Sequence, residues 1–67
     1  MKKFFCVVSS DDVLIRVTND YAKALSSSSF LRNSRMYEVP ERSAERAARH
    51  AATKWGLILA EGCVDVI

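Results

Sequence analysis

The chain has 67 residues, of which 49% are hydrophobic and 27% are charged, and its formal net charge is +2. This composition is ordinary for a globular domain and excludes a wholly disordered chain, and no apolar run approaches the ~20 residues that a membrane-spanning helix needs. So small a positive net charge argues against a protein that imitates DNA with an acidic surface, and the length predicts one domain, residues 1–67, with a single small core.

Residues 4–18 are predicted to form a β-hairpin. The apolar run from Phe4 to Val8 ends at a Ser-Ser-Asp-Asp turn, and residues 13–18 then alternate in the pattern of a half-buried strand. The run is shorter than the apolar core of a secretory signal, and two aspartates follow at once. We therefore expect an internal strand of a cytoplasmic protein rather than an export signal, with Cys6 and Cys63 buried and reduced rather than joined in a disulfide.

Residues 19–35 are the least regular part of the sequence. Either Asn19 or Asp20 can cap a short helix, but the four consecutive serines at 26–29 weaken its continuation. We expect a short helix or loop and then a mobile stretch, with Phe30 and Leu31 packed on the core. The residues expected to remain exposed are Arg32, Asn33, Ser34 and Arg35.

The clearest elements follow. Residues 36–39 are predicted to form a third strand that Pro40 ends, and a helix from about Glu41 to Trp55 is closed by Gly56. Apolar residues recur along this helix at helical spacing and form one stripe, composed of Ala44, Ala47, Ala48, Ala51, Ala52 and Trp55. A stripe of small side chains lets a helix approach a sheet closely.

A last strand is predicted after Gly56, with a bulge or turn at Glu61-Gly62 and an alternation of Val64, Asp65 and Val66 beyond it. The fold class is therefore α+β, with a small, mainly antiparallel sheet of three or four strands and one alanine-rich helix packed on one face. The other face of the sheet is expected to be left to solvent or to a partner.

Catalytic and metal-binding patterns are not recognisable. His50 is the only histidine, and no hydroxyl or carboxylate stands with it in a catalytic motif, so a non-enzymatic protein is expected. Neither cysteine has a neighbour at zinc-ligand spacing, and no metal or cofactor is predicted.

A mildly basic surface is the best candidate for a contact site, although a solvated outer face is also what any surface helix carries. The candidate partner-binding residues are Arg32, Arg35, Tyr37, Arg42, Arg46, Arg49 and Lys54. Guanidinium groups bind both phosphates and carboxylates, so these residues leave nucleic acid and acidic protein open as targets.

Two stretches carry a resemblance. YEVPERSAERAARHAATKWG, followed by CVDVI, resembles the strand, turn, alanine-rich helix and final strand of very small phage-encoded proteins that disable host machinery, such as the phage inhibitor of bacterial RNA polymerase and several anti-CRISPR proteins. The similarity covers residues 36–67. It implies an inhibitor in the host cytoplasm that binds a host protein or ribonucleoprotein complex and blocks it, with no membrane partner and with a homodimer left open.

A second resemblance gives the alternative function. SAERAARHAA is similar to the closing helix of double-stranded-RNA-binding domains, whose alanines pack on a three-stranded sheet. That family begins with a helix and has a lysine pair at the start of its closing helix, whereas this chain begins with a predicted strand and has Glu41-Arg42-Ser43 at that place. The resemblance implies a small RNA- or DNA-binding module that uses the same arginines.

Overall fold

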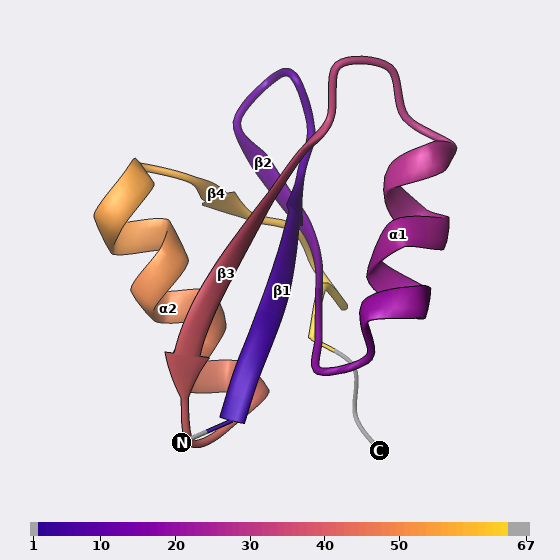
Figure 1. Ribbon diagram of the computed structural model, residues 1–67. Coiled ribbons are helices and arrows are strands. Elements are labelled where there is room, and N and C mark those ends of the chain that lie inside the picture. Colours follow the sequence, from indigo (N-terminus) through magenta and orange to yellow (C-terminus); the bar gives the residue numbers. More distant parts are fainter. Residues whose placement is uncertain (1, 65–67) are drawn as a thin grey trace.

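The computed structural model describes residues 2–64, which form a four-stranded sheet between two helices (Figure 1). The elements in chain order are β1 (Lys2–Val8), β2 (Val13–Thr18), α1 (Tyr21–Ser29), β3 (Arg35–Glu41), α2 (Ala44–Trp55) and β4 (Ile58–Leu59). The strand order is β3-β1-β2-β4, with β1 antiparallel to both of its neighbours and β4 parallel to β2. The predicted α+β class, with a mainly antiparallel sheet and an alanine-rich helix on one face, is confirmed.

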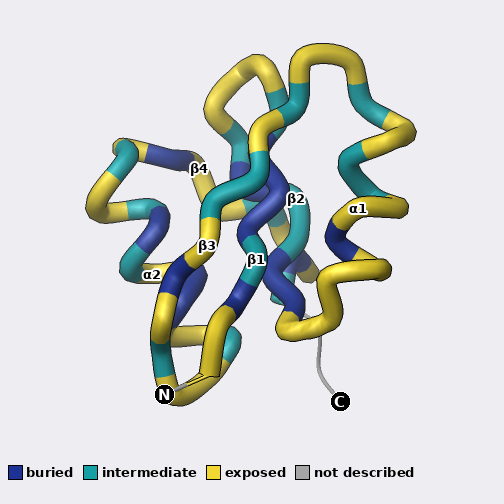
Figure 2. The backbone as a smooth tube through the Cα atoms, in the orientation of Figure 1, coloured by how far each residue is buried: buried dark blue, intermediate teal, exposed yellow. Residues whose placement is uncertain are grey.

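The main core lies between the sheet and α2. Cys6 in β1 stands opposite Val17 in β2 and Tyr37 in β3, so these three side chains share the face that α2 covers. Ala47 and Ala51 are fully buried against this face, which confirms the alanine stripe. The buried residues of the cluster are Phe4, Cys6, Val8, Leu14, Val17, Val39, Ala47, Ala48, Ala51 and Leu57. Figure 2 shows this buried band running through the central strands and the inner side of α2.

The opposite face of the sheet was expected to be left to solvent or to a partner, but in the structure α1 lies against part of it (Figure 1). Ala24 on α1 is fully buried. The rings of Phe5 and Tyr21 meet edge to face with their centroids 5.2 Å apart, and a guanidinium nitrogen of Arg16 in β2 donates to the hydroxyl of Ser27 at 2.9 Å. This helix therefore makes the sheet the middle layer of three.

The serine run is helical throughout, so the expectation that it would weaken the helix was wrong. Asp20 caps the first turn by accepting from the backbone N–H groups of Ala22 and Lys23. At the other end Ser29 Oγ donates to the carbonyl of Ser26, and Ser27 accepts from Arg16 of β2, a tertiary contact that the local sequence does not show. Phe30, expected to pack on the core, is instead 85% exposed.

The junction between β3 and α2 also differs from expectation. The strand continues through Pro40 and Glu41, and the helix begins at Ala44 with Ser43 as its cap, whose hydroxyl accepts from the N–H of Arg46. Proline is tolerated because β3 is an edge strand, where one side of the backbone has no strand partner. Gly56 ends α2 as predicted, with a left-handed φ of 65°.

The last strand is shorter than predicted and runs parallel to β2. The turn at Glu61-Gly62 is present, and Val64 then forms a bridge with Val17. The predicted alternation at Asp65 and Val66 lies outside the described residues. No helix among residues 2–64 is long and apolar enough to cross a membrane.

Candidate functional site

The outer side of α2 carries a hollow of about 550 Å³, which we call the basic hollow. Its lining residues are Glu41, Arg46, Arg49, His50, Thr53 and Lys54. Three of these, Arg46, Arg49 and Lys54, were predicted as contact residues from the sequence. The structure therefore brings together three of the predicted cations around one shallow, open surface.

The placement of this surface follows from the helical repeat. Positions 46, 49, 50 and 53 recur at the spacing of one helix face, opposite the alanine stripe that packs on the sheet. Arg46, Arg49 and Lys54 are exposed. Among residues 2–64 no carboxylate forms an ion pair with any of these three cations. Their charges are thus available to an external anion.

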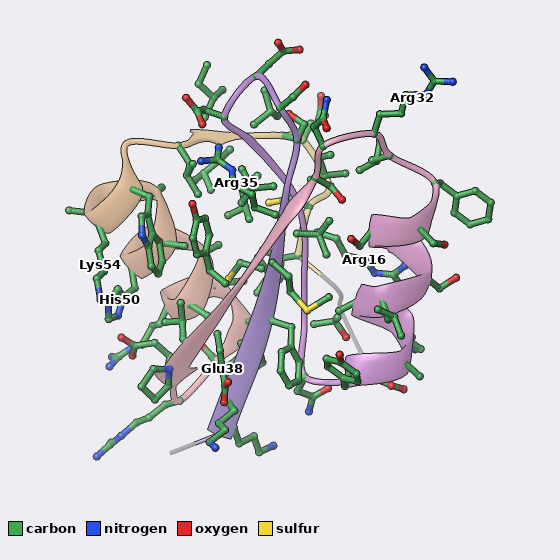
Figure 3. All side chains as sticks on the ribbon, turned by 45° about the horizontal axis from the view of Figure 1, so that its top comes forward. Arg16, Arg32, Arg35, Glu38, His50 and Lys54 are labelled. Carbon is green, nitrogen blue, oxygen red and sulfur yellow. The ribbon has the colours of Figure 1, made fainter. Side chains whose placement is uncertain are left out.

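His50 and Glu41 form a contact that the sequence did not reveal. The Nδ1 atom of His50 lies 2.9 Å from a carboxylate oxygen of Glu41, and both side chains are partly buried. The sequence placed Glu41 in the first turn of the helix, whereas in the structure it ends β3 and reaches His50 from there. Glu41 is the only carboxylate among the residues that line the basic hollow, and it is paired with His50. The contact links the end of β3 to the middle of α2. Figure 3 shows His50 and Lys54 next to each other on this helix.

Tyr37 lies at the end of α2 rather than in the basic hollow. Its ring stacks on that of Trp55 with centroids 4.0 Å apart and an interplanar angle of 10°. The ammonium group of Lys54 lies 5.0 Å from the centroid of the same indole ring. Both Tyr37 and Lys54 therefore lie against the indole ring of Trp55.

Arg35 connects β3 to the turn of the hairpin. It forms an ion pair with Asp12, and its guanidinium carbon lies 5.8 Å from the ring centroid of Tyr37. The hydrogen bond that Arg35 donates to Asp12 raises the pKa of Arg35. Because Asp12 already occupies this guanidinium, Arg35 is a weaker candidate for an external contact than Arg46 or Arg49.

The two remaining predicted residues lie apart from the basic hollow. Arg32 stands in the loop between α1 and β3 and points away from the molecule (Figure 3). Arg42, predicted to lie on the helix face, precedes α2 and lines a smaller hollow of about 190 Å³ together with Lys2 and Asn19. Neither residue extends the surface that Arg46 and Arg49 share.

The chemistry of the basic hollow is that of anion binding. Guanidinium groups can donate paired hydrogen bonds to a carboxylate or a phosphate, and Lys54 adds a point charge. Within the described part of the chain, no three histidine, cysteine, aspartate or glutamate side chains are placed to hold a metal ion. No family model matches this chain, and no curated protein or solved structure matches it significantly.

Proposed function

We propose that this protein is a small non-enzymatic inhibitor that binds a host nucleic-acid-handling complex through the basic hollow and blocks it. The observation that carries the proposal is the convergence of Arg46, Arg49 and Lys54, without carboxylate partners among residues 2–64, on one shallow, open surface of a packed helix. Complexes of this class, such as a CRISPR effector or RNA polymerase, expose phosphates and acidic side chains. The resemblance to phage-encoded inhibitors supports a bacterial target.

The position of the hollow supports a binding role. A guanidinium on a docked helix loses less freedom on binding than one on a loose loop, because the helix backbone is already ordered. The contact between Glu41 and His50 and the stack of Tyr37 on Trp55 hold the two ends of the hollow against β3. A surface arranged before binding retains more of its contact energy as affinity.

The test is capture from a bacterial lysate, with and without nuclease, by the purified protein and by the triple variant Arg46→Glu, Arg49→Glu and Lys54→Glu. We expect the protein to recover a defined complex that resists nuclease, to inhibit the nucleic-acid activity of that complex, and to lose both properties in the triple variant. A matched control reverses Lys23, Arg32 and Arg42, three exposed cations outside the basic hollow, and so changes the net charge equally.

Each other outcome has a definite meaning. Recovery of nucleic acid alone, abolished by nuclease and weakening steeply with salt, would replace the inhibitor by an RNA- or DNA-binding module. Equal loss of binding in the triple variant and in the matched control would show that net charge, rather than the basic hollow, attracts the target.

A further inference from the structure

A second hollow adjoins the basic hollow across Arg49. It lies between α2 and the segment that begins at β4, and its volume is about 390 Å³. Its walls are mostly apolar, with Ala48 from the helix and Leu59 and Val64 from the chain after it. Leu59 is 47% exposed although it is a large apolar residue. We call this surface the apolar groove.

Arg49 lines both surfaces, so the apolar groove and the basic hollow form one continuous contact area. Glu45 also lies on the rim of the groove and would repel an approaching anion there. An anionic group of a partner is therefore favoured on the side of Arg49 that faces Arg46 and Lys54. An apolar group next to that anion would then reach Leu59 and Ala48.

We propose that the partner segment is an acidic peptide stretch of a protein, with a carboxylate paired to Arg49 and an adjacent aliphatic side chain in the apolar groove. This inference rests on the proposed function and specifies the chemistry of its target. Protein interfaces combine a buried apolar anchor with a polar rim in this way. Duplex nucleic acid presents phosphates to such a surface but no aliphatic side chain, and the indole ring of Trp55, on which an unpaired base could stack, is already stacked on Tyr37 and contacted by Lys54.

Strand alternation supplies a matched pair of variants. Leu59 lines the apolar groove, whereas its neighbour Ile58 does not, and both are exposed residues of β4. Successive side chains of a strand point to opposite faces, so Leu59→Asn and Ile58→Asn remove similar apolar area from opposite sides. Neither residue belongs to the buried core, and both variants should fold.

The experiment titrates the ¹⁵N-labelled protein with an acetylated and amidated peptide made of aspartate, aspartate and leucine. The reference peptide has serine in place of leucine, and the third probe is a short DNA duplex. We expect the leucine peptide to bind about tenfold more tightly than the serine peptide, because a largely buried leucine side chain is worth about that factor. Amide shifts should change around Arg49, Leu59 and Val64. Leu59→Asn should abolish the preference for leucine, and Ile58→Asn should keep it.

Equal binding of the two peptides, binding of neither, or equal effects of the two variants would overturn the inference. A DNA duplex that shifts the same amides more strongly than the leucine peptide would also overturn it. The proposed function has its own test in the triple variant, which leaves Leu59 unchanged. If the triple variant loses the captured complex while leucine makes no difference, the proposed function stands and the acidic peptide does not.

Discussion

Helices α1 and α2 cover opposite faces of one sheet with different kinds of residues. Under α2 the stripe of alanines meets a row of buried apolar side chains, and the stack of Tyr37 on Trp55 fixes the end of the helix. On α1 itself only Ala24 is fully buried; Ser27 accepts a hydrogen bond from Arg16 of the sheet, and Ser28 bonds to Ser34 in the loop before β3. Helix α2 is docked mainly by close apolar packing, whereas α1 contributes one fully buried alanine, the edge of one aromatic ring and a serine hydroxyl that accepts from Arg16 of the sheet.

This difference shows how each face of so small a sheet is stabilised. Buried apolar area is the larger favourable term in folding, so the face under α2 should contribute most of the stability. A hydrogen bond of a part-buried serine replaces one that the same group makes to water in the unfolded chain, so it contributes less to the free energy of folding. The outer surface of α2 is then held in place by the most stable part of the molecule, and it is the surface that carries the basic hollow.

The largest expected change in unfolding free energy comes from removing one aromatic ring from each helix, Trp55 from α2 and Tyr21 from α1. Trp55→Ala should lower the free energy of unfolding by about 3 kcal/mol, because it removes both the stack on Tyr37 and the packing against the core. Tyr21→Ala should cost about 1 kcal/mol, since Tyr21 is 55% exposed and meets Phe5 only edge to face. Urea denaturation of both variants measures the difference. Equal losses would show that the two faces contribute alike.

The sequence predicted the face under α2 well because its signal is periodic. Six apolar positions at helical spacing fix which side of the helix is buried, and Gly56 fixes where it ends. The start of the helix was misplaced by three residues. Pro40 and Glu41 suit a first helical turn as well as an edge strand, and pairing of Lys2 with Glu41 and of Lys3 with Pro40 decides between them. That pairing is a long-range contact and leaves no local signal.

The face under α1 was not predictable for the same reason. Serine disfavours helix in isolation, and the contacts that override this preference join residues far apart in the chain, such as Arg16 with Ser27. The parallel pairing of β4 with β2 is likewise set by tertiary contacts. Within the candidate site, the cations of α2 could be found from the sequence, whereas the contact of Glu41 with His50 depended on where β3 ends.

A second prediction concerns the thiol of Cys6, which lies in β1 and is buried beneath α2. Burial, with a smaller contribution from the charge of Cys63, raises the pKa of Cys6 from its ordinary value of 9.0 to about 11. The folded state therefore keeps the thiol proton at pH values where the unfolded chain releases it. The stabilisation is fully present below pH 9 and is lost as the pH rises towards 11, by about 2–3 kcal/mol.

The control for this prediction is Cys6→Ala. Tyrosine and lysine side chains also titrate in this pH range, so the quantity to compare is the difference in unfolding free energy between the protein and the variant at each pH. That difference should shrink from pH 9 to pH 11. A constant difference would mean that water reaches the Cys6 thiol. In that case α2 would shield its face of the sheet from water no better than α1 shields the opposite face.

The last prediction tests the packing of α2 most directly. Ala51→Leu inserts a larger side chain at a fully buried position of the stripe, and the overpacking should cost about 1–3 kcal/mol. Ala22→Leu makes the same change at an exposed position of α1, where the unfolding free energy should stay within about 0.5 kcal/mol. Alanine and leucine have similar helix propensities, so the contrast between the variants reports packing alone.

Arg46→Ala, on the outer side of α2, should also have only a small effect on the unfolding free energy. The urea denaturation midpoints of these variants should be compared, and an unchanged dependence of the unfolding free energy on urea concentration shows that the shifts report stability. If Ala51→Leu proved as mild as Ala22→Leu, the alanine stripe would not be pressed on the sheet, and the basic hollow would lack the fixed support on which its proposed role depends.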